Sequence, residues 1–158
     1  MVAKWRLSPN LAAMFIVDDC SLSFEIPARD SLGRDAVEGQ IAGTQDRVLF
    51  TWRLKDRTFR KGDADMKSVE IPYGKVEKVL FKATLGFLNP RLIFDVIDAQ
   101  LLANVPGTDV GKATLRLPPK SKEAARKFIK MVEFKKTEEA VRISRTRLLD
   151  IPEAGKLE

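Results

Sequence analysis

The sequence predicts a mainly β fold, an antiparallel barrel or sandwich that is capped by a C-terminal α-helix. Several short segments between Ser21 and Leu117 alternate apolar and polar residues, which is typical of half-buried antiparallel strands. Glycine, proline and asparagine cluster between these segments, as turns require. After Pro118 and Pro119 the apolar spacing changes to that of a helix. Strands followed by one amphipathic helix favour a curled sheet with the helix across one opening, and closure into a barrel would remove exposed edges.

Seven segments are predicted to be strands. In the clearest, residues 47–55, four large apolar side chains alternate with polar ones, and Trp52 is expected in the core. Two glycines in the segment 37–44 favour a bulge or tight curvature. Asn89 and Pro90 are expected to turn the chain between two strands. In order, the predicted strands are residues 21–26, 37–44, 47–55, 68–71, 76–85, 91–97 and 111–117.

A helix is predicted after the double proline. Ser121 is a suitable N-cap, and Glu123 suits the positive end of the helix dipole. One apolar stripe is formed by Ala124, Ala125, Phe128, Ile129 and Val132. A second helical stretch is expected over residues 137–149. We therefore expect an N-terminal extension, a central domain, and a C-terminal helical extension with a tail, at residues 1–19, 20–136 and 137–158.

Composition narrows the classes of function. The 158 residues suit one domain whose core needs no disulfides. The chain has no histidine and one cysteine, Cys20, which argues against zinc and iron–sulfur sites, rules out histidine-dependent nucleophilic catalysis and favours a reducing compartment. Chemistry by carboxylates or lysine remains open. No glycine spacing matches a phosphate-binding loop, and no apolar window approaches a membrane span of ~20 residues. We expect a non-enzymatic cytoplasmic protein without cofactor, metal or transmembrane segment.

The charge of the chain favours acidic partners. The formal net charge is +6 and the pI about 9.5. Between residues 53 and 61, five cations and one acid leave a local charge of +4, and Phe59 could insert at a membrane interface or stack on a base. The alternative is a solvated hairpin, which nearby Asp63 and Asp65 favour. The candidate anion-binding residues are Arg53, Lys55, Arg57, Arg60 and Lys61.

A second basic region follows the double proline. Residues 120–136 contain seven basic and two acidic residues, a local charge of +5. Such a helix can meet anionic lipid or nucleic acid. The alternative is that its charged side faces water while the apolar stripe packs. The seven residues are Lys120, Lys122, Arg126, Lys127, Lys130, Lys135 and Lys136.

Several segments together resemble a known superfold. They are Glu38-Gly39, residues 44–50, residues 69–79 with their Ile-Pro step, the strand 113–117 and the helix 121–134. This pattern resembles the pleckstrin-homology (PH) superfold, in particular its GRAM-like and bacterial branches, over about residues 20–135. Domains of this kind are mostly binding modules, and the fold alone does not fix the ligand.

The leading hypothesis is a binding module that engages a protein partner or an anionic membrane surface through the basic hairpin. It would be cytoplasmic and able to act peripherally at the membrane. One alternative is a nucleic-acid-binding protein that uses the same hairpin and the C-terminal helix. Another is a self-assembling structural protein, a homo-oligomer joined through edge strands or through residues 137–149.

Overall fold

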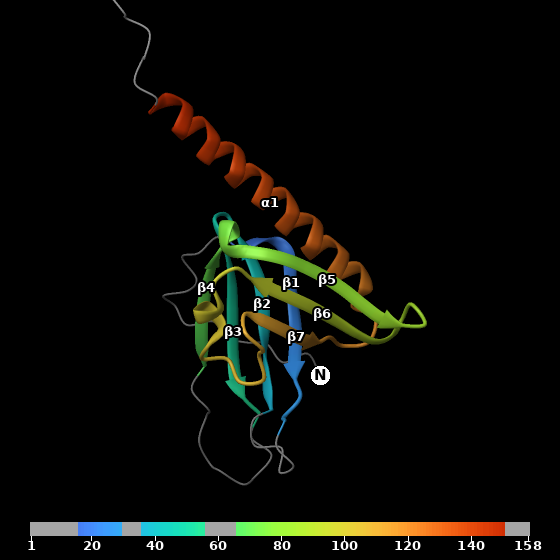
Figure 1. Cartoon of the computed structure of the whole chain (residues 1–158). Coiled ribbons are helices and arrows are strands. Elements are labelled where there is room, and N and C mark those ends of the chain that lie inside the picture. The colour runs from blue at the N-terminus through green and yellow to red at the C-terminus, as the bar shows by residue number, and fades with distance from the viewer. Residues whose placement is uncertain (1–15, 30–35, 56–65, 151–158) are drawn as a thin grey trace, which may run out of the picture.

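The computed structural model describes residues 16–29, 36–55 and 66–150, and it confirms the mainly β fold with a C-terminal helix (Figure 1). In these residues, seven antiparallel strands form one sheet in the order β4-β3-β2-β1-β7-β6-β5. The strands are β1 (Ile16–Ile26), β2 (Val37–Thr44), β3 (Arg47–Leu54), β4 (Lys67–Pro72), β5 (Val76–Thr84), β6 (Leu88–Val96) and β7 (Lys112–Arg116). The helices are the 3-10 helices η1 (Tyr73–Lys75) and η2 (Ala99–Leu102) and the α-helix α1 (Lys122–Leu149).

The sheet curls into a half-barrel but does not close. β4 and β5 are the two edges of the sheet, and η1 joins them in sequence without a ladder of hydrogen bonds between them. The predicted antiparallel β fold with a helix across one opening is therefore confirmed, in the form of an open half-barrel. Helix α1 lies across the opening and packs on β1, β5 and η1, so its side chains cover the apolar interior that closure would otherwise cover (Figure 1).

The interior is built from the alternate residues of each strand. Phe24 and Phe50 face each other across β1 and β3 with ring centroids 4.7 Å apart, and Trp52 is buried as expected. The pairing of β2 with β3 runs without a shift, but the pairing of β1 with β2 is irregular between Ile16 and Ser21, opposite Gly43. A Cβ on Gly39 would lie 2.9 Å from the Phe24 ring, so this glycine makes room for the core.

Helix α1 is one continuous element of 28 residues rather than two helical stretches. Its first half buries the predicted stripe, with Ala125, Phe128 and Val132 inaccessible to solvent. No glycine or proline interrupts residues 133–149, and most of these residues are good helix formers, so the helix continues past the sheet. Ser121 is the N-cap, but its hydroxyl donates to the Pro118 carbonyl at 2.7 Å rather than capping the helix.

Tyr73 contacts both the sheet and helix α1 through its hydroxyl group. Its hydroxyl donates a hydrogen bond of 2.6 Å to the Thr44 carbonyl and lies 3.3 Å from the Met131 sulfur of α1. Burial of this hydroxyl raises the pKa of Tyr73 above its ordinary value. A single buried polar group thus links η1, the end of β2 and the helix.

Candidate functional site

Three large apolar side chains are exposed at the tip of the β5–β6 hairpin. Leu85 is 78% exposed, Phe87 68% and Leu88 44%. Figure 1 shows this hairpin extending away from the rest of the sheet. Adjoining apolar side chains that project into solvent are typical of interaction surfaces. We therefore take the hairpin tip as the candidate functional site.

The turn at this tip has a backbone that disfavours leucine. Leu85 and Gly86 have φ angles of 52° and 79°, and the Phe87 amide donates to the Thr84 carbonyl at 3.2 Å. Two consecutive positive φ angles are the pattern of a type I′ turn, which favours Asn-Gly or Asp-Gly. A non-glycine residue in the left-handed region costs about 1–2 kcal/mol. An exposed leucine in this position therefore gains no stability from packing or from backbone preference.

The predicted turn at Asn89 and Pro90 is wrong, because the chain turns four residues earlier. Both residues lie inside β6, where the pairing with β5 shifts between Lys82 and Thr84. Asn89 has a φ of 49°, and Pro90 is buried. A β-bulge tolerates proline, which cannot donate to the ladder, so the Asn-Pro pair here bends a strand instead of ending it.

A row of cations crosses the outer face of the sheet below the tip. Lys82 on β5 lies opposite Arg91 on β6, and Arg91 lies opposite Arg116 on β7. All three side chains are exposed, and none forms an ion pair with a carboxylate in the described part of the chain. Like charges directly opposite each other in a sheet are destabilising. We call Lys82, Arg91 and Arg116 the basic row.

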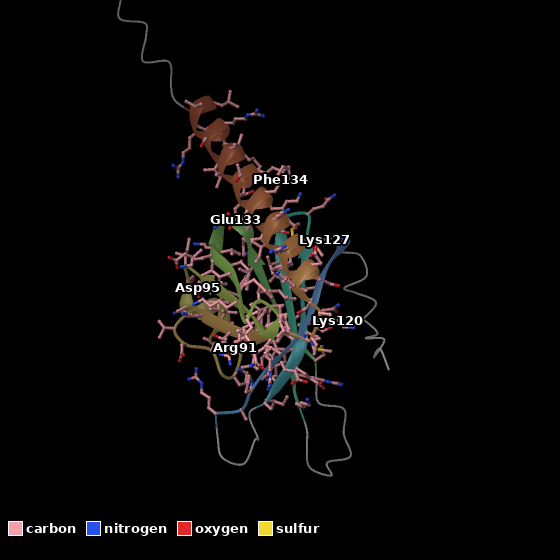
Figure 2. All side chains as sticks on the ribbon, turned by 90° about the vertical axis from the view of Figure 1, so that its right-hand side faces the viewer. Arg91, Asp95, Lys120, Lys127, Glu133 and Phe134 are labelled. Carbon is pink, nitrogen blue, oxygen red and sulfur yellow. The ribbon has the colours of Figure 1, made fainter. Side chains whose placement is uncertain are left out.

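Further cations lie near the basic row. Lys120 is exposed in the turn that leads into α1, with a φ of 65°. Figure 2 looks at the side of the molecule toward which the hairpin extends, and Arg91 and Lys120 both lie below the start of α1 in this view. Lys127 follows on the helix itself. The hairpin tip is thus accompanied by positive charge from the sheet, the turn and the helix.

A pocket of about 370 Å³ adjoins the basic row where β1 and β7 separate. Its two carboxylates are engaged, since Glu25 accepts from Lys55 at 2.7 Å and Glu38 accepts from Arg53 at 2.9 Å. Arg116 is shared between this pocket and the row. The lining residues are Ser23, Phe24, Glu25, Glu38, Gly39, Arg116, Leu117, Pro118 and Pro119.

The candidate site at the β3 hairpin is described only in part. Arg53 and Lys55 lie at the end of β3, and the carboxylates of Glu38 and Glu25 neutralise them. The other predicted residues, Arg57, Arg60 and Lys61, lie outside the described residues, as does Phe59. Of the five predicted anion-binding residues, the two that the structure describes, Arg53 and Lys55, are therefore each paired with a glutamate.

The basic region at residues 120–136 buries its apolar stripe, but not all of its cations face water alone. Its apolar stripe packs as expected, whereas some of its cations contact the protein: Lys136 donates to the Glu77 carbonyl at 2.7 Å and Lys135 lies 3.3 Å from Glu138. The hairpin tip and the basic row were not predicted from the sequence. A signal was present in Leu85-Gly-Phe-Leu88, where three large apolar residues surround a glycine at the end of a predicted strand.

No protein-family model, curated protein or solved structure matches this chain. Among the helices of the described chain, none has the length and apolar composition needed to span a bilayer. Residues 16–29, 36–55 and 66–150 contain no group of three or more acidic or cysteine side chains that could hold a metal ion.

Proposed function

We propose that this protein is a non-enzymatic module of PH-like architecture that binds anionic membrane surfaces peripherally, with the β5–β6 hairpin as the contact. The observation that carries the proposal is the order of two features along the hairpin, an apolar tip and then a row of cations. Leu85, Phe87 and Leu88 project at the tip, and the exposed basic row follows directly. An apolar tip followed by the basic row matches the two layers of a bilayer interface, in which acyl chains lie beneath anionic headgroups.

The spacing along the strand fits the depth of that interface. Leu85 and Lys82 are three residues apart, which corresponds to about 10 Å along a β-strand. Interfacial segments bury their apolar side to a depth of about 5–10 Å at the boundary of headgroups and acyl chains. When the tip reaches the acyl layer, the basic row therefore lies at the level of the phosphates.

The free-energy contributions of the basic row and of the tip correspond to reversible membrane binding. Each cation near an anionic membrane surface contributes about 1 kcal/mol, so the basic row supplies about 3 kcal/mol. Burial of a large apolar side chain contributes about 1.5–3 kcal/mol, and the three tip residues add several kcal/mol. The cost of immobilising the protein on the surface offsets a part of this sum. The tip and the row each contribute several kcal/mol, so the loss of either should weaken binding.

The proposal is tested by sedimentation of the full chain with vesicles of phosphatidylcholine alone and vesicles with about 30% phosphatidylserine. We expect binding to the anionic vesicles only, and weaker binding as salt rises from about 0.1 to about 0.5 M. Phe87→Ser should weaken binding about tenfold, because it removes one apolar anchor.

Ile97→Ser is the matched control. Ile97 is 64% exposed, close to the 68% of Phe87, but it follows the far end of β6. The nine intervening steps place it about 30 Å from the tip. Binding of this variant should equal that of the unmodified chain. Equal binding to neutral and anionic vesicles, or equal losses in the two serine variants, would exclude the hairpin as the contact.

A further inference from the structure

The last part of α1 extends beyond the sheet. Residues 141–150 are all exposed, whereas the last fully buried side chain of the helix is Val132 (Figure 1). Phe134, Val141 and Leu148 are 65%, 46% and 68% exposed. Phe134 is visible on the helix in Figure 2. The helix therefore carries large apolar side chains that the rest of the described chain leaves in solvent.

These three residues form one row along the helix. Each is seven residues from the next, which is close to two helical turns, so their side chains project on the same side. Phe134 lies nearly half a turn around the helix from Val132, which packs on the sheet. The row therefore faces away from the half-barrel and spans about 21 Å of helix at 1.5 Å per residue.

Charges flank this row in a self-complementary order. Glu138 and Arg145 lie on the same side of the row and are themselves seven residues apart. Glu138 is 58% exposed in a surface pair with Lys135, so its carboxylate can reach a second partner. Charges in such flanking positions set the partner and the orientation of paired helices.

We propose that this outward face of α1 binds a second copy of the chain with the two helices antiparallel. A two-fold axis beside Val141 places the two Val141 side chains together and each Phe134 against Leu148 of the other copy. The same axis brings Glu138 within one residue, about 1.5 Å along the axis, of the second copy's Arg145, and it does so twice. A parallel pair would instead place these charges opposite Thr137 and Ser144.

The test is the molar mass of the full chain by light scattering and its sedimentation velocity, without lipid, from about 1 to about 300 μM. We expect the mass to rise from one chain toward two. Val141→Glu should remain monomeric over this range. Glu138→Arg should weaken association about tenfold, because two attractive pairs become two repulsive ones. Arg145→Glu should do the same, and the double variant with both reversals should associate within about threefold of the unmodified chain.

The outcomes are decisive because all substituted side chains are exposed, and circular dichroism should show unchanged helix content in every variant. An unmodified chain that stays monomeric overturns the proposal. A double variant as weak as either single reversal overturns the antiparallel pairing. Vesicle binding takes no part in these measurements, so the result is independent of the proposed membrane contact.

Discussion

The two halves of the sheet differ in the charges that one row of paired positions presents on the outer face. One row of paired positions crosses six strands, from Lys82, Arg91 and Arg116 on β5, β6 and β7 to Glu25, Glu38 and Arg53 on β1, β2 and β3. On the β1–β3 side, Lys55 and Arg53 neutralise the two glutamates. On the β5–β7 side, Arg116 lies opposite Glu25 of β1, but no ion pair joins Arg116, Arg91 or Lys82 to a carboxylate among the described residues.

The β1–β4 half repeats this pairing at its other end. Arg47 on β3 binds Asp46 at 2.8 Å and also pairs with Glu70 on β4. The hydrogen bond from Arg47 holds the pKa of Asp46 below its ordinary value. Cross-strand pairs of opposite charge add modest stability to a sheet. The charges of this half are therefore explained by the fold.

In the β5–β7 half, Asp95 lies opposite Lys78 and Lys112, but the basic row is not explained by such pairs. Its basic row lowers stability, and the turn beside it carries a leucine where the backbone favours asparagine. Residues that violate local rules without a compensating contact are expected at functional sites. The two surfaces therefore differ in the distribution of acids around the cations rather than in the number of cations.

The largest expected effect comes from neutralising each half in turn. The triple variant Lys82→Gln, Arg91→Gln and Arg116→Gln should weaken binding to anionic vesicles about 100-fold, because each cation contributes about 1 kcal/mol. Its matched control is Arg53→Gln, Lys55→Gln and Lys67→Gln, which removes the same three charges from the β1–β4 half. Sedimentation with vesicles at constant salt measures both.

We expect the control triple to bind within about threefold of the unmodified chain, since two of its cations are already paired with glutamates. Equal losses in both triples would mean that the net charge of the chain decides binding. The contrast between the two halves would then carry no functional meaning.

A second prediction concerns the turn. Leu85→Asn should raise the free energy of unfolding by about 1 kcal/mol, because asparagine accepts the positive φ that leucine resists. Leu88→Asn should lower it, because Leu88 lies in β6 and asparagine disfavours strands. Both variants should weaken vesicle binding several-fold, as each removes a tip side chain.

Thermal unfolding followed by circular dichroism measures this difference, with a shift of about 2–4 °C per kcal/mol expected at this chain length. Parallel loss of stability in both variants would show that Leu85 contributes to folding. The tip would then be a structural element of the hairpin rather than a surface kept for a partner.

Much of the fold could be predicted from the sequence because strands and helices have different periods. Alternation placed Phe50 and Trp52 in the core, and helical spacing placed Phe128 and Val132 on the buried face of the helix. The open sheet could not be predicted, because alternation reports which face is buried and not which edges pair. The Asn-Pro pair at residues 89 and 90 misled because a turn and a bulge favour the same residues.

The candidate site was harder to predict, because it depends on residues that are distant in sequence. Lys82, Arg91 and Arg116 become neighbours only through the pairing of β5, β6 and β7. The cations of residues 53–61 are dense in sequence, but the acids that neutralise Arg53 and Lys55 come from β1 and β2. The density of cations in the sequence therefore predicted a binding site in the half of the sheet where Arg53 and Lys55 are paired with glutamates.

The smallest expected effect is also the most direct comparison of the two halves, because one substitution should have opposite signs in each. Arg91→Gln should raise the free energy of unfolding by about 0.2–1 kcal/mol, since it removes a cation lying between Lys82 and Arg116. Arg53→Gln should lower it by a similar amount, because Glu38 loses its partner at 2.9 Å. Urea unfolding at low salt measures both, and high salt should shrink the two shifts toward zero. If both substitutions destabilise the chain, the cations of the basic row stabilise the fold and need no binding partner to explain them. The distinction between the two halves of the sheet then fails.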